Sequence, residues 1–123
     1  MKDFLAVTKA LSDENRARIM MFLQDGELCV CQVIAMLELA PSTVSKHLNV
    51  LCQAGLIESR KQGRWIYYRL AGPDARRPIP AAIKWLRESL SREPEVTRDA
   101  KKRKAVCRTS LSELCCRYAK ETK

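Results

Sequence analysis

The sequence of 123 residues contains one histidine, only 4 glycines and 5 prolines, and 6% aromatic residues. So little glycine and proline argues against a collagen-like or low-complexity chain, and so few aromatic residues disfavour a β-sandwich. No apolar run approaches the roughly 20 residues that span a bilayer. The opening residues, MKDFLAVTKALSDENR, lack the hydrophobic stretch of a secretion signal. We therefore predict a mainly helical cytoplasmic protein with one core and no membrane association.

Catalytic signatures are also missing from the sequence. It contains no glycine-rich phosphate loop and no G-x-S-x-G motif, and His47 is the only histidine available as a base for a cysteine nucleophile. We predict that the chain is not an enzyme and carries no prosthetic group.

Positive charge and cysteine are what the sequence does contain. The formal net charge is +9, concentrated in the C-terminal half, which favours a polyanionic partner. In a reducing compartment, 6 cysteines indicate soft-metal binding or redox chemistry rather than three disulfides. They occur as the pair Cys29 and Cys31, an adjacent pair at 115–116, and two isolated residues, Cys52 and Cys107. We interpret the isolated cysteines as small buried side chains.

Apolar spacing predicts the elements in order. Spacings of three and four indicate helices ending near Ser12, over 14–24, over 30–37 and over 42–54. The period then changes to that of two strands, 56–60 and 64–70, joined by a glycine-containing loop.

A fifth helix is predicted over 80–93, and Pro94 separates it from a further helical segment. Four helices, two strands and a fifth helix are typical of a winged helix-turn-helix, a mainly α fold with a β-hairpin wing. We expect residues 1–93 to form this DNA-binding and dimerisation domain. Residues 94–123 would be a basic, cysteine-containing helical extension.

Double-stranded DNA is the partner that this arrangement favours. The helix over 42–54 would enter the major groove while the preceding helix crosses the backbone. Its first turns carry short hydroxyls and hydrogen-bond donors: Ser42, Thr43, Ser45, Lys46 and His47. The hairpin tip offers groups suited to phosphate or minor-groove contacts: Arg60, Lys61, Gln62 and Arg64. Helix capping and a solvated wing would explain the same residues without DNA.

An ordered set of motifs over about residues 3–90 resembles the ArsR/SmtB family of metalloregulatory repressors. The motifs are Ala10-Leu11-Ser12-Asp13, Arg18-Ile19, Glu27-Leu28-Cys29-Val30-Cys31, Ser42-Thr43-Val44-Ser45-Lys46-His47-Leu48, Ala54-Gly55-Leu56-Ile57, Arg60-Lys61-Gln62-Gly63-Arg64-Trp65 and Tyr68-Arg69-Leu70. The resemblance implies a homodimeric winged-helix repressor with a palindromic operator.

The family pairs its subunits mainly through the first and last helices. The resemblance therefore places at the dimer interface Phe4, Leu5, Ile83, Leu86 and Leu90. For the stripe at 83–90, an intramolecular core face is the alternative.

The segment 27–31 is similar to the arsenic-sensing branch, in which two cysteines one residue apart are followed by a third three residues later. Ile34 occupies that third position here. The resemblance implies trivalent arsenic or antimony as the inducer, bound by Cys29 and Cys31. Because arsenite prefers three thiolates, a third ligand is expected from Cys115, Cys116 or Cys107. Alternatively, a methylated arsenical would need only two sulfurs.

The spacing of the pair suggests how binding acts on DNA. Residues i and i+2 of a helix lie about 200° apart, at roughly 100° per residue. Either Cys29 lies outside the first helical turn or binding unwinds that turn. Because the segment 38–41 joins this helix to the next, both movements would re-aim the DNA-reading residues and release the operator.

The sequence also allows other inducers and another function. The same thiols would suit a redox-sensing repressor or one responsive to cadmium or lead, although family members that sense cadmium use cysteines ahead of the first helix and none precedes Cys29 here. Zinc sensing is disfavoured because it needs histidine and carboxylate ligands on the fifth helix. An architectural nucleic-acid protein could instead use the basic residues Arg98 and 101–104.

Overall fold

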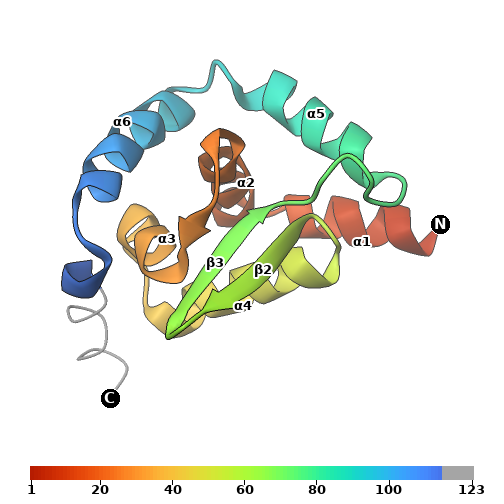
Figure 1. The fold of residues 1–123 in the computed structure, drawn as a ribbon. Coiled ribbons are helices and arrows are strands. Elements are labelled where there is room, and N and C mark those ends of the chain that lie inside the picture. Colours follow the sequence, from red (N-terminus) through yellow and green to blue (C-terminus); the bar gives the residue numbers. More distant parts are fainter. Residues whose placement is uncertain (115–123) are drawn as a thin grey trace.

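The structure is a computed structural model that describes residues 1–114. Figure 1 shows its elements, which follow in chain order: α1 (Lys2–Leu11), α2 (Glu14–Phe22), the 3₁₀ turn η1 (Leu23–Asp25), β1 (Leu28–Cys29), α3 (Val30–Leu37), α4 (Pro41–Gln53), β2 (Ile57–Gln62), β3 (Trp65–Leu70), α5 (Ile79–Leu90) and α6 (Pro94–Arg108). A last helical turn covers residues 111–114.

The predicted winged helix-turn-helix is confirmed, with one strand more than expected. The hairpin strands β2 and β3 pair along their length, and β1 pairs with the other edge of β3, giving the order β1-β3-β2. All pairs are antiparallel, and Cys29 lies opposite Tyr67. Two residues are too short to show an alternating pattern, so the sequence did not predict β1.

Local chemistry explains where the helices of the helix-turn-helix begin and where the wing turns. The Asp13 side chain caps α2, accepting the backbone N–H of Arg16 at 3.1 Å. Pro41 occupies the first turn of α4, where the missing N–H costs no hydrogen bond. In the loop between β2 and β3, Gly63 has a φ of 61°, a conformation that glycine adopts without strain.

Two apolar clusters lie inside the part of the protein that the structure describes. The larger one joins α2, α3 and α4 beneath the sheet and includes the fully buried Ile19, Val33, Leu48 and Leu51. The smaller one consists of Cys29, Cys31, Ala35 and Leu114, with Val30, Trp65, Tyr67, Val106 and Leu111 packed against it. The second cluster therefore joins the cysteine pair to the wing and to the C-terminal extension.

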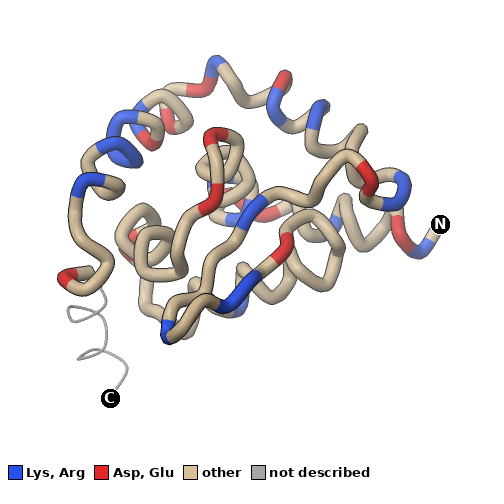
Figure 2. Tube along the Cα trace, in the orientation of Figure 1, with Lys and Arg blue, Asp and Glu red and all other residues tan. Residues whose placement is uncertain are grey.

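Helix α6 lies against α2 and α3, on the side of the molecule away from the N-terminus (Figure 1). Lysine and arginine residues recur along it (Figure 2). No helix within residues 1–114 combines the length and the apolar character required to cross a bilayer.

Candidate nucleic-acid interface and cysteine pair

The two cysteines of the pair lie on either side of a helix boundary. Cys29 is the last residue of β1 and the N-cap of α3, with an extended backbone (φ −74°, ψ 153°), while Cys31 lies in the first helical turn. The backbone N–H of Cys29 donates to the side-chain oxygen of Gln32 at 2.8 Å, which fixes the boundary. Cys29 therefore lies outside the first turn of α3, which is the first of the two predicted alternatives. The two cysteine side chains are then not held about 200° apart around one helix axis.

The C-terminal extension covers this pair. Cys29 is 0% exposed and has a free thiol, whereas Cys31 is 7% exposed and disulfide-bonded. The buried Leu114 packs in the same cluster. Ser110 Oγ accepts the backbone N–H of Glu113 at 3.2 Å, which caps the short turn that carries Leu114. A ligand at the pair would therefore meet residues of the extension as well as those of α3.

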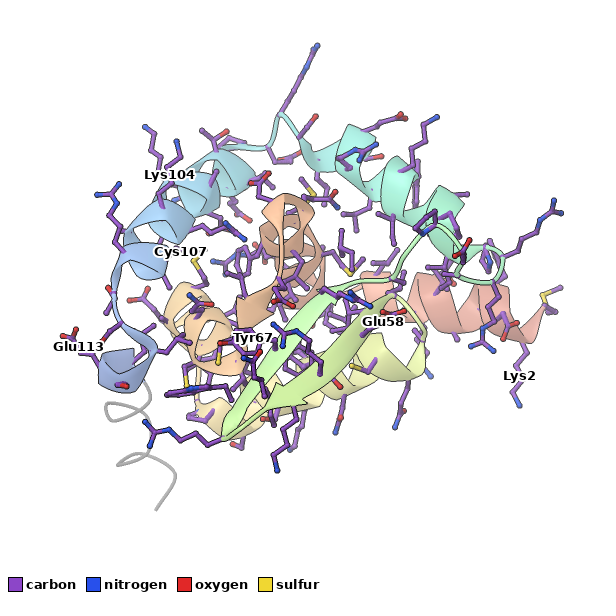
Figure 3. The ribbon with its side chains drawn as sticks, in the orientation of Figure 1. Lys2, Glu58, Tyr67, Lys104, Cys107 and Glu113 are labelled. Carbon is purple, nitrogen blue, oxygen red and sulfur yellow. The ribbon has the colours of Figure 1, made fainter. Side chains whose placement is uncertain are left out.

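The structure answers only part of the third-ligand prediction. Within residues 1–114, no group of three histidine, cysteine, aspartate or glutamate side chains is arranged to hold a metal ion. Cys107 lies on α6 and is exposed (Figure 3). The other two candidates, Cys115 and Cys116, lie outside the described residues.

The isolated cysteines differ from each other. The prediction that both are buried is wrong for Cys107, because no part of the described chain covers its position on α6. Cys52 is partly buried and packs against the main core. Burial raises the pKa of the Cys52 thiol, so at neutral pH it stays protonated and unreactive.

Direct connections run from the cysteine pair to the wing. Cys29 lies opposite Tyr67 in the antiparallel pair, so β1 joins the cysteine to strand β3 of the wing. Arg60 on β2 forms a bidentate ion pair with Glu27, two residues before Cys29, and its guanidinium also lies 4.5 Å from the centre of the Tyr67 ring. Sequence reasoning missed both connections, since they join positions more than thirty residues apart.

The predicted groove-reading residues largely share one exposed face of α4. Four of them are exposed: Ser42, Thr43, Ser45 and Lys46. His47 is mostly covered instead, with Nδ1 lying 3.3 Å from Arg16 Nη1 and 4.0 Å from Asp13 Oδ1. The helical spacing extends the exposed face to Asn49 and Val50, which sequence reasoning did not include. His47 therefore joins α4 to the start of α2.

At the wing tip, Lys61, Gln62 and Arg64 are exposed, as the sequence predicted. The Arg64 guanidinium lies 4.6 Å from the centre of the Trp65 ring. Arg60 differs because its donors are already engaged by Glu27 and, at 2.6 Å, by Gln62. Lys61 and Arg64 are therefore the wing cations best placed to meet phosphates.

The predicted dimer residues divide into two groups. Phe4 and Leu5 are 54% and 53% exposed on α1. Leu86 is 5% exposed and belongs to the core of the subunit, with Ile83 and Leu90 packed partly buried against that core. Sequence reasoning missed Trp85, which is 64% exposed and borders a groove of about 420 Å³ between α1 and α5.

Comparison with known proteins finds the family model described as "Bacterial regulatory protein, arsR family" over residues 13–59. An arsenic resistance transcriptional regulator of Pseudomonas putida is 40% identical over 63% of this chain and 61% of its own. The arsenical resistance operon repressor of Escherichia coli is 44% identical over 51% of this chain and 55% of its own. The chain thus spans little more than half the length of these two relatives.

A cadmium resistance regulatory protein homologue of Staphylococcus aureus is 38% identical over 72% of this chain and 74% of its own. These relatives are named as regulators and repressors rather than as enzymes, which agrees with the prediction that the chain is not an enzyme.

Two solved structures show the same fold. HlyU of Vibrio cholerae superimposes with a TM-score of 0.64 at 30% identity, covering 74% of this chain and 95% of that protein. A homodimeric winged helix-turn-helix DNA-binding domain of Mycobacterium bovis gives a TM-score of 0.62 at 27% identity, covering 73% and 77%.

Proposed function

Since the chain belongs to the ArsR family of bacterial regulatory proteins, we propose that it is a dimeric transcriptional repressor released from its operator by trivalent arsenic. The observation that carries the proposal is the position of Cys29. It ends a strand paired to the wing and caps the helix that precedes α4, so a ligand at this point would act on two elements that are each joined to a DNA-reading element.

DNA binding uses the exposed face of α4 and the wing tip. The hydroxyls of Ser42, Thr43 and Ser45 and the ammonium of Lys46 suit base edges and phosphates in the major groove. A second copy of the chain, docked through the α1–α5 face that exposes Phe4, Leu5 and Trp85, would present two such units to a palindromic operator. The homodimeric Mycobacterium bovis neighbour supports this assembly.

Arsenic binding replaces oxygen ligands by sulfur. Cys31 is disulfide-bonded in the structure, so a reductant such as a thiol must first open that bond. Each cysteine thiol then displaces one hydroxide of arsenous acid and releases one water, so that two As–S bonds form while arsenic stays trivalent. Two cysteines leave one hydroxide on arsenic, and a third thiol would displace it. Soft thiolates suit this ion. The apolar surroundings of Cys29 and Cys31 then exclude water from the bound ion.

A third sulfur would come from the residues after Leu114. Leu114 packs in the cluster of the cysteine pair, and the next residue in the sequence is Cys115. This adjacency supports Cys115 or Cys116 over Cys107, which is exposed on α6. A methylated arsenical would need no third sulfur.

Release follows from moving Cys29. Drawing its sulfur and that of Cys31 onto one ion would pull on β1, and through the Cys29–Tyr67 register on the wing. The same pull acts on α3, which the turn 38–40 joins to α4. A coupling of about 1–3 kcal/mol, typical of allostery, weakens operator affinity about 5- to 150-fold.

The test measures binding to an operator duplex selected from random sequence by the purified protein. Fluorescence anisotropy gives the dissociation constant with and without sodium arsenite, in a phosphine reductant because dithiols chelate arsenite. We expect arsenite to weaken binding by the wild type and to leave Cys29→Ser and Cys31→Ser bound. Cys107→Ser is the matched control and should respond like the wild type.

If arsenite still released both Cys29→Ser and Cys31→Ser from the operator, the proposed arsenic site would be refuted. A parallel titration tests cadmium as a second inducer, which the similarity to a cadmium resistance regulatory protein homologue of Staphylococcus aureus favours. Release by cadmium alone would assign the site to that ion. Release by peroxide alone, with arsenite and cadmium inactive, would replace metal sensing by a redox response.

A further inference from the structure

The C-terminal extension contacts both ends of α3. Near the start of α3, Val106, Leu111 and Leu114 pack against the cluster that contains the cysteine pair. Near its end, Lys102 Nζ donates to the backbone carbonyl of Met36 at 3.0 Å and lies 2.9 Å from the Glu38 carboxylate. One segment, residues 102–114, therefore spans the helix from the proposed sensor to the turn that leads into α4.

The residue that Lys102 holds has an unusual backbone. Glu38 lies in the left-handed region, with a φ of 56°, and is the only residue other than glycine within 1–114 that does so. For a residue other than glycine, this backbone conformation is unfavourable by a free energy of about 1 kcal/mol or more. It persists where contacts with neighbouring groups hold the backbone in place. The ammonium of Lys102 supplies two of these contacts, one to the carboxylate and one to the Met36 carbonyl in the last turn of α3, where carbonyls lack intrahelical partners.

The charge arrangement keeps this contact in place. The hydrogen bond from Lys102 holds the pKa of the Glu38 carboxyl below its usual range, so the ion pair persists to a lower pH than an unperturbed glutamate would allow. Lys102 itself is fixed because α6 is anchored on both sides of it. Arg103 donates to the Phe22 and Gly26 carbonyls at 2.9 and 3.2 Å, and Asp99 accepts two bonds from Arg18 at 3.0 Å each.

We infer that the extension is a second line of communication between the cysteine pair and the DNA-reading helix, with Lys102 as its positioning residue. A ligand at the pair displaces the apolar end of the extension at residues 106–114. Helix α6 carries that displacement to Lys102, which then shifts Glu38 and the turn before α4. The inference rests on the proposed function and adds the element that transmits binding.

The test compares Lys102→Gln with Lys101→Gln. Lys101 is the adjacent exposed lysine, so both variants lose the same charge from α6. The measured quantity is the ratio of operator dissociation constants with and without sodium arsenite, on the full chain. We expect Lys102→Gln to lower this ratio about two- to thirtyfold, the range for residues that modulate coupling between sites. Lys101→Gln should keep the wild-type ratio.

Arsenite binding is measured separately through the near-ultraviolet absorption of arsenic–sulfur bonds. A positioning role predicts unchanged arsenite affinity in Lys102→Gln and recovery of the ratio in Lys102→Arg, which keeps a donor and a charge. Equal ratios in Lys102→Gln and Lys101→Gln would overturn the inference. A reduced ratio caused by lost arsenite binding would also overturn it, because Lys102 would then act at the sensor.

Glu38→Gln provides an independent variant if Lys102→Gln does not fold. It removes the same ion pair from the other side, and it should lower the ratio as well; an unchanged ratio would contradict the inference. If the wild type shows no arsenite response, the proposed function fails by itself. A responsive wild type with a fully responsive Glu38→Gln refutes only the role of the extension.

Discussion

Residues 1–93 and residues 94–114 are held in the structure by different forces. The winged-helix part surrounds an apolar cluster whose central side chains, such as Leu48 and Leu51, are fully buried. The extension is attached mainly through charged groups, with Asp99, Lys102 and Arg103 each bound to a group on α2, on α3 or next to them. Its apolar packing is concentrated at its far end, where Val106 packs against both apolar clusters and Leu111 and Leu114 pack in the cluster of the cysteine pair.

This difference assigns folding stability to the winged helix and transmission of ligand binding to the extension. Apolar burial is the dominant favourable term in folding, whereas exposed or partly exposed ion pairs contribute much less. The winged helix should therefore determine whether the protein folds. The extension can shift or detach at a much smaller cost, which suits an element that responds to ligand.

The largest effect is expected in the winged-helix core. Leu48→Ala removes a fully buried side chain between α4 and its neighbours and leaves a cavity. We expect the free energy of unfolding to fall by about 2–5 kcal/mol, measured by urea denaturation. A loss no greater than that of the extension variants would remove the contrast between the two regions.

An intermediate effect is expected where the extension is anchored. Asp99→Asn removes the charge from a buried carboxylate that binds Arg18 through two hydrogen bonds of 3.0 Å. We expect a loss of about 1–3 kcal/mol in the same denaturation experiment, the range for a broken charged hydrogen bond. Glu88→Gln, an exposed change on α5, is the control and should lie near the wild type. A loss equal to that of Leu48→Ala would mean that the extension belongs to the folding core.

The smallest effect on stability is expected for Lys102→Gln. Glu38 is exposed, and exposed ion pairs contribute little to folding. The urea midpoint should stay close to that of Lys101→Gln even though the response to arsenite falls. A large drop in the midpoint would show that Lys102 is a structural anchor rather than a transmitter.

Sequence reasoning predicted the elements whose residues are neighbours along the chain. The spacing of Val44, Leu48 and Leu51 predicted α4, and the change of period predicted the hairpin. Contacts between residues far apart in the sequence could not be predicted from spacing. Lys102 reads as one cation of a solvated basic face, and only the packing of α6 on α3 places it beside Glu38.

The candidate site shows the same limit. The pair Cys29 and Cys31 was visible from its spacing, whereas the strand that joins it to the wing is two residues long. The contacts of Arg60 were hidden too, because its partner Glu27 lies in a loop with no pattern of its own. His47 was predicted on a DNA-facing position, but its ring packs toward Arg16. The spacing of apolar residues predicts which residues share one face of a helix or strand. It does not predict which other part of the chain packs against that face.

Reciprocal binding measurements show whether the cysteine pair and the operator site are coupled. If a ligand at the cysteine pair weakens operator binding, then the operator must weaken ligand binding by the same factor. We would measure the arsenite affinity of the wild type, free and saturated with operator duplex, alongside the operator affinity with and without arsenite. The account predicts two equal ratios of about 5- to 150-fold. Equal arsenite affinities for the free and DNA-bound protein would contradict it.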